Sequence, residues 1–329
     1  MKNMLRAGAH PLWSIILAGG EGERTRPFIE QWLGGHKPKQ YCTFVGNRSM
    51  LQHTLDRADR LVRPEQKVTV IGRNHRKFLN EAMEGSTSGH VIVQPRNCGT
   101  APGVFLPLTF VRAWDADATV VIFPSDHFVF PEARFLETIR RGIRASHFLQ
   151  DRLILFGVPP SHPELDYGWI NLGEVLGWSH GSCIRHVGSF LEKPDLLEGK
   201  QVMASGALWN TLVIVAKVAT LWKLGWRTLP DMMERFEQLG ATIGTVHENE
   251  TLHEIYRDMP ILDFSRTLLQ RIPEHLGVME FEEVLWSDWG QPERIAHTLK
   301  TLGKKPAFPS EILQRSLAPT DAIPHVEVT

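Results

Sequence analysis

The chain has 329 residues, of which 42% are hydrophobic and 22% are charged, a composition typical of a globular protein with one large α/β domain. Its 36 basic and 37 acidic side chains give a net charge of -1. Without an overall basic field, binding of nucleic acid or of an anionic membrane is not expected as its main function.

Residues 12–18 form an apolar run after Lys2 and Arg6, which loosely imitates a secretory signal peptide. The run is short and leads directly into a glycine-rich loop, so a buried strand is the better interpretation. The 3 cysteines are scattered and form neither a disulfide framework nor a CxxC pair. No stretch approaches the roughly 20 apolar residues of a membrane span. We therefore expect a cytoplasmic protein that binds no membrane.

The first half of the chain alternates short apolar runs, rich in β-branched residues, with segments of helical period. This pattern is typical of a mostly parallel sheet covered by helices. The predicted strands are residues 14–17, 67–71, 90–93, 119–123 and 153–158. Helices are predicted after Ser49, which can cap the first of them, over residues 100–114, and after Pro131.

After about Gly157 the pattern changes to two antiparallel strands, residues 167–172 and 184–191, separated by a turn over residues 178–183. Helical patterns return at residues 215–224, 230–239, 263–271 and 291–302. Prolines punctuate the chain from Lys304 onward, which indicates an extended or partly disordered tail. We therefore predict an N-terminal extension (1–13), one domain (14–303) and a C-terminal tail (304–329).

The strongest local motif is Gly19-Gly20-Glu21-Gly22-Glu23-Arg24, which directly follows the first predicted strand. Glycines allow the backbone N–H groups to approach a ligand, and arginine suits phosphate, so the motif indicates a phosphate-binding loop. It lacks the Gly-Lys-Ser/Thr ending of a P-loop and the spacing of a dinucleotide fingerprint. A flexible surface turn is the alternative. Lys39 follows Pro38 and can neutralise a triphosphate, although a solvated lysine fits the same pattern.

Three later carboxylates stand at positions that suit a site. Asp126 follows a very apolar strand, and the carboxyl end of such a strand is where an open α/β sheet binds ligands, including divalent cations. A helix or turn cap explains Asp126 equally well. Glu192, beside Lys193, and Asp288, in a glycine-containing turn, fit either a substrate contact or an ordinary surface interaction.

Taken together and in order, these motifs resemble the sugar-1-phosphate nucleotidyltransferases, most closely the mannose-1-phosphate guanylyltransferases. The matching segments are residues 17–28, 38–40, 96–102, 124–127, 167–170, 192–194, 208–211 and 286–290. Four features depart from the family's pattern. They are Thr25 and Phe28 in place of leucines, a longer spacer before Pro38, Cys98-Gly99 inside the segment linked to base recognition, and Thr211-Leu212 after Asn210.

The resemblance implies a Rossmann-like, three-layer αβα fold of the GT-A-like type, with a mixed central sheet and no C-terminal β-helix. It implies Mg²⁺-dependent transfer of a nucleotidyl group from GTP to mannose 1-phosphate, giving GDP-mannose and pyrophosphate. The catalytic residues would be Arg24, Lys39 and Asp126, with Asp126 and Asp288 holding the metal. Nucleotide-binding residues would be Leu17, Ala18, Gly19, Gly20, Gly22, Asn97 and Thr100. Sugar-phosphate-binding residues would be Gly168, Glu192, Lys193 and Asn210.

Other interpretations remain open at this stage. A different base or sugar, such as glucose 1-phosphate, keeps the reaction class, because contacts in the pocket decide specificity. A catalytically silent regulator that binds sugar nucleotides belongs to another class, although it would have no need of both metal aspartates. A homodimer is expected from family behaviour alone, and the partners expected are GTP and mannose 1-phosphate rather than nucleic acid.

Overall fold

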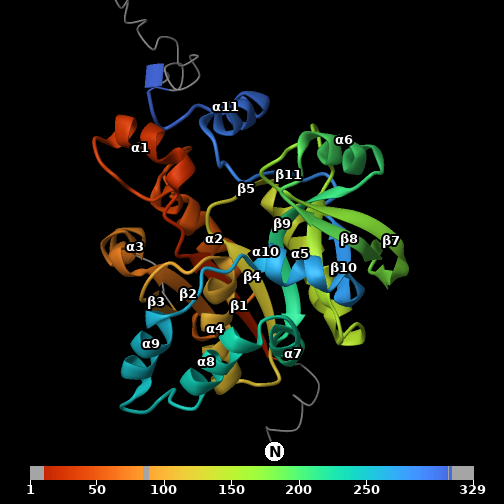
Figure 1. The fold of residues 1–329 in the computed structure, drawn as a ribbon. Helices are drawn as coiled ribbons and strands as arrows, with labels where there is room; N and C mark the ends of the chain where they lie inside the picture. Colours follow the sequence, from red (N-terminus) through yellow and green to blue (C-terminus); the bar gives the residue numbers. More distant parts are fainter. Residues whose placement is uncertain (1–10, 84–88, 310, 313–329) are drawn as a thin grey trace, which may run out of the picture.

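The computed structural model describes residues 11–83, 89–309 and 311–312 (Figure 1). Its strands are β1 (Leu12–Ala18), β2 (Lys67–Gly72), β3 (His90–Gln94), β4 (Thr119–Pro124), β5 (Phe128–Phe130), β6 (Leu153–Val158), β7 (Gly168–Ser179), β8 (Ser182–Glu192), β9 (Leu208–Lys217), β10 (Leu276–Glu280) and β11 (Leu285–Ser287). Its helices are α1 (Arg26–Leu33), α2 (Met50–Asp59), α3 (Arg76–Met83), α4 (Thr100–Trp114), α5 (Glu132–Phe148), α6 (Leu196–Ala204), α7 (Val218–Thr228), α8 (Pro230–Gly240), α9 (Glu248–Arg257), α10 (Phe264–Thr267) and α11 (Pro292–Thr301).

A nine-stranded mixed sheet forms the centre, in the order β3-β2-β1-β4-β9-β6-β10-β8-β7. β1, β2, β3 and β4 are mutually parallel, whereas β9 runs antiparallel to both β4 and β6. Side chains alternate across β1 as expected for a strand buried on both faces. Trp13 and Ile15 enter one hydrophobic core, and Ile16 and Ala18 enter another.

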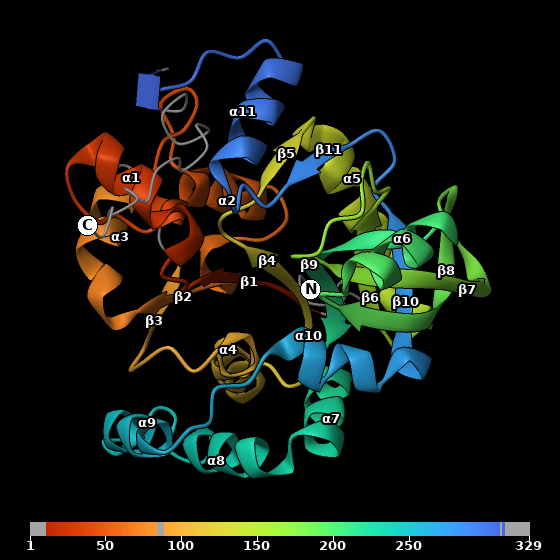
Figure 2. The ribbon, with the colours of Figure 1, turned by 45° about the horizontal axis from the view of Figure 1, so that its top comes forward.

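Helices cover both faces of this sheet (Figure 2). α4, α7, α8, α9 and α10 lie on one side, and α2, α3 and α5 lie on the other. Helix α2, which packs its apolar face on the sheet, begins at a capping box. In this box Ser49 accepts a hydrogen bond from the N–H of Gln52. The expected three-layer αβα arrangement with a mixed central sheet is therefore confirmed.

The antiparallel pair after residue 157 is confirmed, but its predicted turn over residues 178–183 is too long. β7 and β8 pair as far as Ser179 and Ser182, and only His180 and Gly181 connect them. Both connecting residues have positive φ, 47° and 87°, which is the geometry of a tight two-residue hairpin. The hairpin therefore extends further than its polar sequence indicated.

The predicted helix over residues 215–224 begins too early. Residues 215–217 are the end of β9, an unpredicted strand, and α7 starts at Val218. A continuous apolar run does not by itself distinguish a buried strand from a helix. The predicted helix over residues 263–271 divides into the short α10 and a separate 3-10 turn, because Leu268 between them leaves helical geometry. Helices α1, α3, α6 and α9 and strands β5, β10 and β11 were also not predicted.

The ends of the chain bear on the expected domain boundaries. Residues 1–10 of the expected extension and 313–329 of the expected tail lie outside the described residues. Within the described part of the tail, Phe308 is buried against Phe28 and Trp32 of α1. The Ala307 N–H also donates to the Phe44 carbonyl at 2.9 Å. The boundary at residue 304 stays a prediction. None of the helices in the described part has the length and apolar character to cross a membrane.

Candidate active site

The glycine-rich loop leaves the carboxyl end of β1 and folds back over the segment that carries Lys39. Gly22 has φ 67°, and a Cβ at that position would lie 3.0 Å from the Lys39 backbone nitrogen, so a side chain would strain this turn. Gln40 holds the loop in place, because its Nε2 donates to the carbonyls of Ala18 at 3.0 Å and Gly20 at 2.7 Å. The sequence therefore builds one rigid unit from the loop and the lysine segment.

Lys39 joins the two predicted metal ligands. Its ammonium is almost fully buried, lies 2.8 Å from Asp126 Oδ2, and also donates to the backbone carbonyl of Asp288. Burial alone would raise the pKa of Asp126, but the Lys39 ammonium and the other groups around the carboxylate together outweigh burial, and the pKa is lowered. Next to it, His127 accepts a hydrogen bond from Trp286, and burial lowers the pKa of His127 to about 4. At neutral pH this histidine is an uncharged neighbour of an ionised carboxylate.

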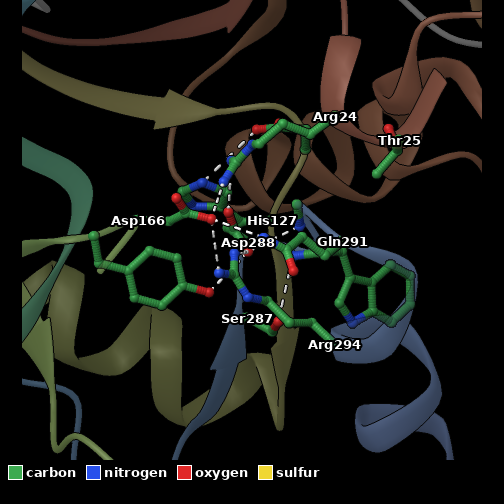
Figure 3. A network of polar contacts seen from close by, with 12 residues as sticks. Arg24, Thr25, His127, Asp166, Ser287, Asp288, Gln291 and Arg294 are labelled. Atoms are coloured by element: carbon green, nitrogen blue, oxygen red, sulfur yellow. Dashed lines mark hydrogen bonds and ion pairs between the residues drawn. The ribbon is translucent and has the colours of Figure 1, made fainter. Parts of the chain in front are cut away.

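The Asp288 carboxylate follows β11 and accepts hydrogen bonds at both oxygens (Figure 3). Its Oδ1 accepts from the Tyr167 hydroxyl at 2.7 Å, from Arg294 Nη1 at 2.8 Å and from the Gly290 N–H at 2.8 Å. Its Oδ2 accepts from Arg24 Nη2 at 3.0 Å. Burial would raise the pKa of Asp288, but the surrounding cations, Lys39 above all, hold it well below its usual range.

A further acidic group lies beside this carboxylate and was missed by the sequence analysis. Asp166 Oδ2 accepts from Arg24 at 2.9 Å, from Gln291 at 2.9 Å and from Arg294 at 3.1 Å (Figure 3). Glu164 pairs with Arg294 at 2.6 Å. These charged residues flank the recognised motifs, immediately before Tyr167-Gly168 and just after Gly290, but nothing in their spacing distinguishes them from surface charges.

A cavity of about 260 Å³ opens next to this network, over Lys39 and Asp126. Its lining residues are Gly22, Glu23, Arg24, Thr25, Lys39, Asp126 and Gly290. Two ionised carboxylates with only oxygen donors suit a hard cation such as Mg²⁺, which takes one or two protein carboxylates and completes its shell with water and substrate phosphates. Within the described residues, no group of three or more His, Cys, Asp or Glu side chains is arranged to hold a metal without such help. The chemistry of Asp126 and Asp288 is therefore compatible with the expected ion, and their role as metal ligands stays a prediction.

The predicted sugar-phosphate residues gather where β7 begins and β8 ends. Gly168 lies opposite Glu192, and a Cβ on Gly168 would come within 2.7 Å of the Glu192 carboxylate. Burial raises the pKa of Glu192 to about 7, with a further contribution from Asp263, while Lys193 opposes it. Lys193 has φ 51° and its ammonium is half exposed. Asn210, in β9, uses its side-chain oxygen to accept a backbone N–H two residues later.

The predicted nucleotide-binding residues divide into two groups. Leu17, Ala18, Gly19, Gly20 and Gly22 lie together in β1 and the loop that follows. Gly19 packs against Gln94 at the end of β3, because a Cβ there would lie 3.2 Å from Gln94 Oε1. This contact brings β3, and the segment after it, next to the loop.

Asn97 and Thr100 lie in that following segment, and their side chains are used within the structure. Asn97 Oδ1 accepts the Gly99 N–H at 2.9 Å, and Thr100 Oγ1 accepts the Phe264 N–H at 2.7 Å. The backbone of Leu262 forms hydrogen bonds on both sides of Gly99. The Cys98-Gly99 departure from the family pattern is thus clamped by the chain leading into α10. A nucleotide-binding role for Asn97 and Thr100 stays a prediction.

Two curated proteins with similar sequences are described as mannose-1-phosphate guanylyltransferases. The chain is 30% identical over 202 residues to a mannose-1-phosphate guanylyltransferase of Salmonella montevideo, covering 60% of this chain and 41% of that protein. It is 25% identical over 304 residues to a mannose-1-phosphate guanylyltransferase of Escherichia coli, covering 90% of this chain and 62% of that protein. The chain thus spans less than two thirds of the length of either relative.

Solved structures and a family model extend the comparison to most of the chain. A structure from Thermus thermophilus, described as a mannose-1-phosphate geranyltransferase, superposes with a TM-score of 0.71 at 24% identity. The match covers 85% of this chain and 76% of that one and shows a shared fold. A family model described as nucleotidyl transferase matches residues 13–305, and the chain therefore belongs to the nucleotidyl transferase family.

Proposed function

We propose that the protein transfers the nucleotidyl group of GTP to mannose 1-phosphate and releases pyrophosphate and GDP-mannose. The observation that carries the reaction class is the cavity in which Arg24, Lys39 and Asp126 meet beside Gly22. Two cations, a glycine loop and an ionised carboxylate are the groups that in-line transfer at a phosphorus needs. The choice of GTP and mannose 1-phosphate rests on the names of the curated relatives.

The chain's own residues have a mainly electrostatic task in this reaction. The attacking phosphate oxygen of the sugar phosphate is already an anion, so no base is needed to activate it. The protein instead holds two anions together and offsets the charge of the transition state. Arg24 faces the leaving phosphates, Lys39 neutralises charge near the α-phosphate, and the Gly19–Gly22 backbone supplies N–H donors.

The remaining residues orient the sugar and the metal. Glu192 accepts hydrogen bonds from sugar hydroxyls, Lys193 pairs with the sugar phosphate, and Gly168 leaves room for the sugar against the backbone. Asp126 and Asp288 would hold Mg²⁺, which, when bound, neutralises and aligns the phosphate oxygens. His127 stays uncharged beside Asp126 and adds no competing cation at neutral pH.

The test is pyrophosphate release by the purified protein with Mg²⁺, crossing GTP, ATP, CTP, UTP and dTTP against mannose 1-phosphate and glucose 1-phosphate. Release with GTP and mannose 1-phosphate alone would support the proposal. Release with another pair would keep the reaction and replace the substrates. No release from any pair would contradict the proposed activity and favour a silent binding protein.

The Asp126→Asn variant tests the role of the carboxylate. We expect turnover to fall by roughly two orders of magnitude or more, because the variant removes a charged metal ligand without changing the side chain's size. Asp117→Asn, at an exposed turn residue before β4, is the matched control and should keep wild-type activity. Full activity of a folded Asp126→Asn protein would contradict the assignment of Asp126 to the metal.

A further inference from the structure

Two arginines share the same pair of carboxylates in the active site. Arg24 donates to Asp166 at 2.9 Å and to Asp288 at 3.0 Å. Arg294 donates to the same two acids, at 3.1 Å and 2.8 Å. Figure 3 shows both guanidinium groups converging on this acidic pair from opposite sides of the site, Arg24 from the glycine loop and Arg294 from α11.

The two arginines differ in exposure and in what else holds them. The Arg24 side chain is 50% exposed and lines the cavity, and the two acids are its only ion-pair partners among the described residues. The Arg294 side chain is 13% exposed, pairs additionally with Glu164 and stacks on the Tyr167 ring at 4.7 Å. Arg24 is therefore placed to leave the acids, and Arg294 is held to them.

The two oxygens of Asp288 differ in the same way. Oδ1 is fixed by three donors, from Tyr167, Arg294 and the Gly290 backbone. Oδ2 accepts a hydrogen bond only from Arg24 among the described residues. Departure of Arg24 would free Oδ2 while the three donors on Oδ1 keep the carboxylate in place.

We propose that Arg24 exchanges Asp166 and Asp288 for the phosphates of the substrate, whereas Arg294 and Tyr167 stay on Asp288 as positioning residues that keep its Oδ2 directed to the cation. The inference rests on the proposed function, because the triphosphate is what draws Arg24 away. It adds residues that the family motifs do not contain, namely Arg294 and Asp166.

Charge balance allows the exchange because Asp288 keeps other cations when Arg24 leaves. A buried carboxylate that loses its only partner is strongly disfavoured. Arg294 stays bonded to Asp288 Oδ1, and the Lys39 ammonium stays on the Asp288 backbone carbonyl, so the carboxylate remains balanced throughout the exchange. Asp166, by contrast, competes with phosphate for Arg24. Removing its charge should therefore strengthen phosphate binding, an effect that the loss of a merely structural contact would not produce.

The first test measures binding of inorganic tripolyphosphate to the full chain by calorimetry in the presence of EDTA. We expect Asp166→Asn to bind tripolyphosphate about 3- to 10-fold more tightly than wild type, because one competitor for Arg24 is lost. Asp117→Asn, which alters an exposed acid away from the site, controls for net charge and should bind as wild type does. Unchanged or weaker binding by Asp166→Asn, or no binding by wild type, would overturn the exchange.

The second test concerns the positioning of Asp288 and uses Mn²⁺ binding followed by electron paramagnetic resonance of the free ion. Arg294→Lys and Tyr167→Phe both keep the net charge but remove hydrogen bonds to Oδ1. We expect the Mn²⁺ dissociation constant of each to rise about 3- to 10-fold without tighter tripolyphosphate binding. Wild-type Mn²⁺ affinity in both folded variants, checked by thermal unfolding, would overturn the positioning role.

Neither test requires turnover. A protein that releases no pyrophosphate from any substrate pair would contradict the proposed function, while the two binding measurements would still decide the exchange and the positioning separately.

Discussion

Lys39 is central to the balance of charge in the site. Its buried ammonium pairs with Asp126 and donates to the Asp288 carbonyl. We expect Lys39→Ala to lower pyrophosphate release by about 10²- to 10³-fold, because it removes transition-state charge stabilisation and leaves two acids less balanced. Lys37→Ala is the control, since Lys37 pairs with the exposed Glu81. Equal activity of the two variants would contradict the central place of Lys39.

Glu192 gives the site a dependence on pH that can be predicted in sign. Burial raises its pKa to about 7 from an ordinary 4.5, so ionising Glu192 destabilises the fold increasingly as pH rises from about 4.5 through 7. Glu192→Gln should therefore raise the melting temperature by roughly 2–6 °C at pH 8 and change it little at pH 4.5. Glu234→Gln, on the exposed side of α8, should change neither. An equal rise in the melting temperature of Glu192→Gln at pH 4.5 and pH 8 would contradict burial of the ionised carboxylate as the cause.

At the same residue, sugar-phosphate binding should follow the charged form. A carboxylate accepts hydrogen bonds from sugar hydroxyls better than a carboxylic acid does, so the wild-type KM for the sugar phosphate should fall as pH rises through 7. The KM of Glu192→Gln should not show that change. An identical pH profile in the two proteins would remove Glu192 from the sugar site.

Individual site residues were predictable from sequence only where they belong to an ordered motif. Arg24, Lys39, Asp126 and Asp288 do, and the structure brings them together around one cavity and its adjoining ion pairs. Arg294 does not, because its role depends on α11 returning the chain to Tyr167, more than a hundred residues earlier. Sequence spacing carries no information on such a contact, since it arises only after the sheet and helices have packed.

At the scale of elements, the parallel half of the sheet and the antiparallel pair β7–β8 were predictable, whereas the antiparallel strand β9 was not. β1, β2, β3, β4 and β6 appear as short β-branched runs within a residue or two of the predicted bounds. The sequence pattern favours a helix for the end of β9, because this strand is buried on both faces and forms one apolar run with α7. Its identity is decided by pairing with β4 and β6, which is information from elsewhere in the chain.

The pairing of β7 with β8 gives a prediction at this scale. A Cβ on Gly168 would lie 2.7 Å from the Glu192 carboxylate and 2.8 Å from the Phe190 ring, so these side chains must shift to accommodate it. Gly168→Ala should raise the KM for the sugar phosphate more than it lowers kcat, because it shifts Glu192 without altering the phosphate loop. Gly103→Ala in α4, with open space around it, is the control. A wild-type KM in Gly168→Ala would show that Glu192 and Phe190 adjust at no cost to the site.

At the scale of the whole molecule, one aromatic cluster connects the active-site segments with the C-terminal part of the chain. Phe28 of α1, Phe44 and Trp289 pack with Phe308 in a single core. Three of these residues lie within a few positions after a residue of the site. Phe28 follows Arg24, Phe44 follows Lys39, and Trp289 follows Asp288. The expected tail therefore contains at least one residue on which the packing behind the site depends. Measuring how much this residue stabilises the fold tests where the domain ends.

Phe308→Ala tests this directly. Phe308 contacts Phe28 at 5.1 Å and Trp32 at 5.4 Å between ring centroids and is 4% exposed, so truncation leaves a cavity in that core. We expect a loss of about 3 kcal/mol in the free energy of unfolding and a melting temperature lower by about 6–12 °C. Leu197→Ala on α6, 66% exposed, should have little effect. If both variants melted with wild type, residues 305–309 would be an appendage; a drop confined to Phe308→Ala would make them part of the folded domain.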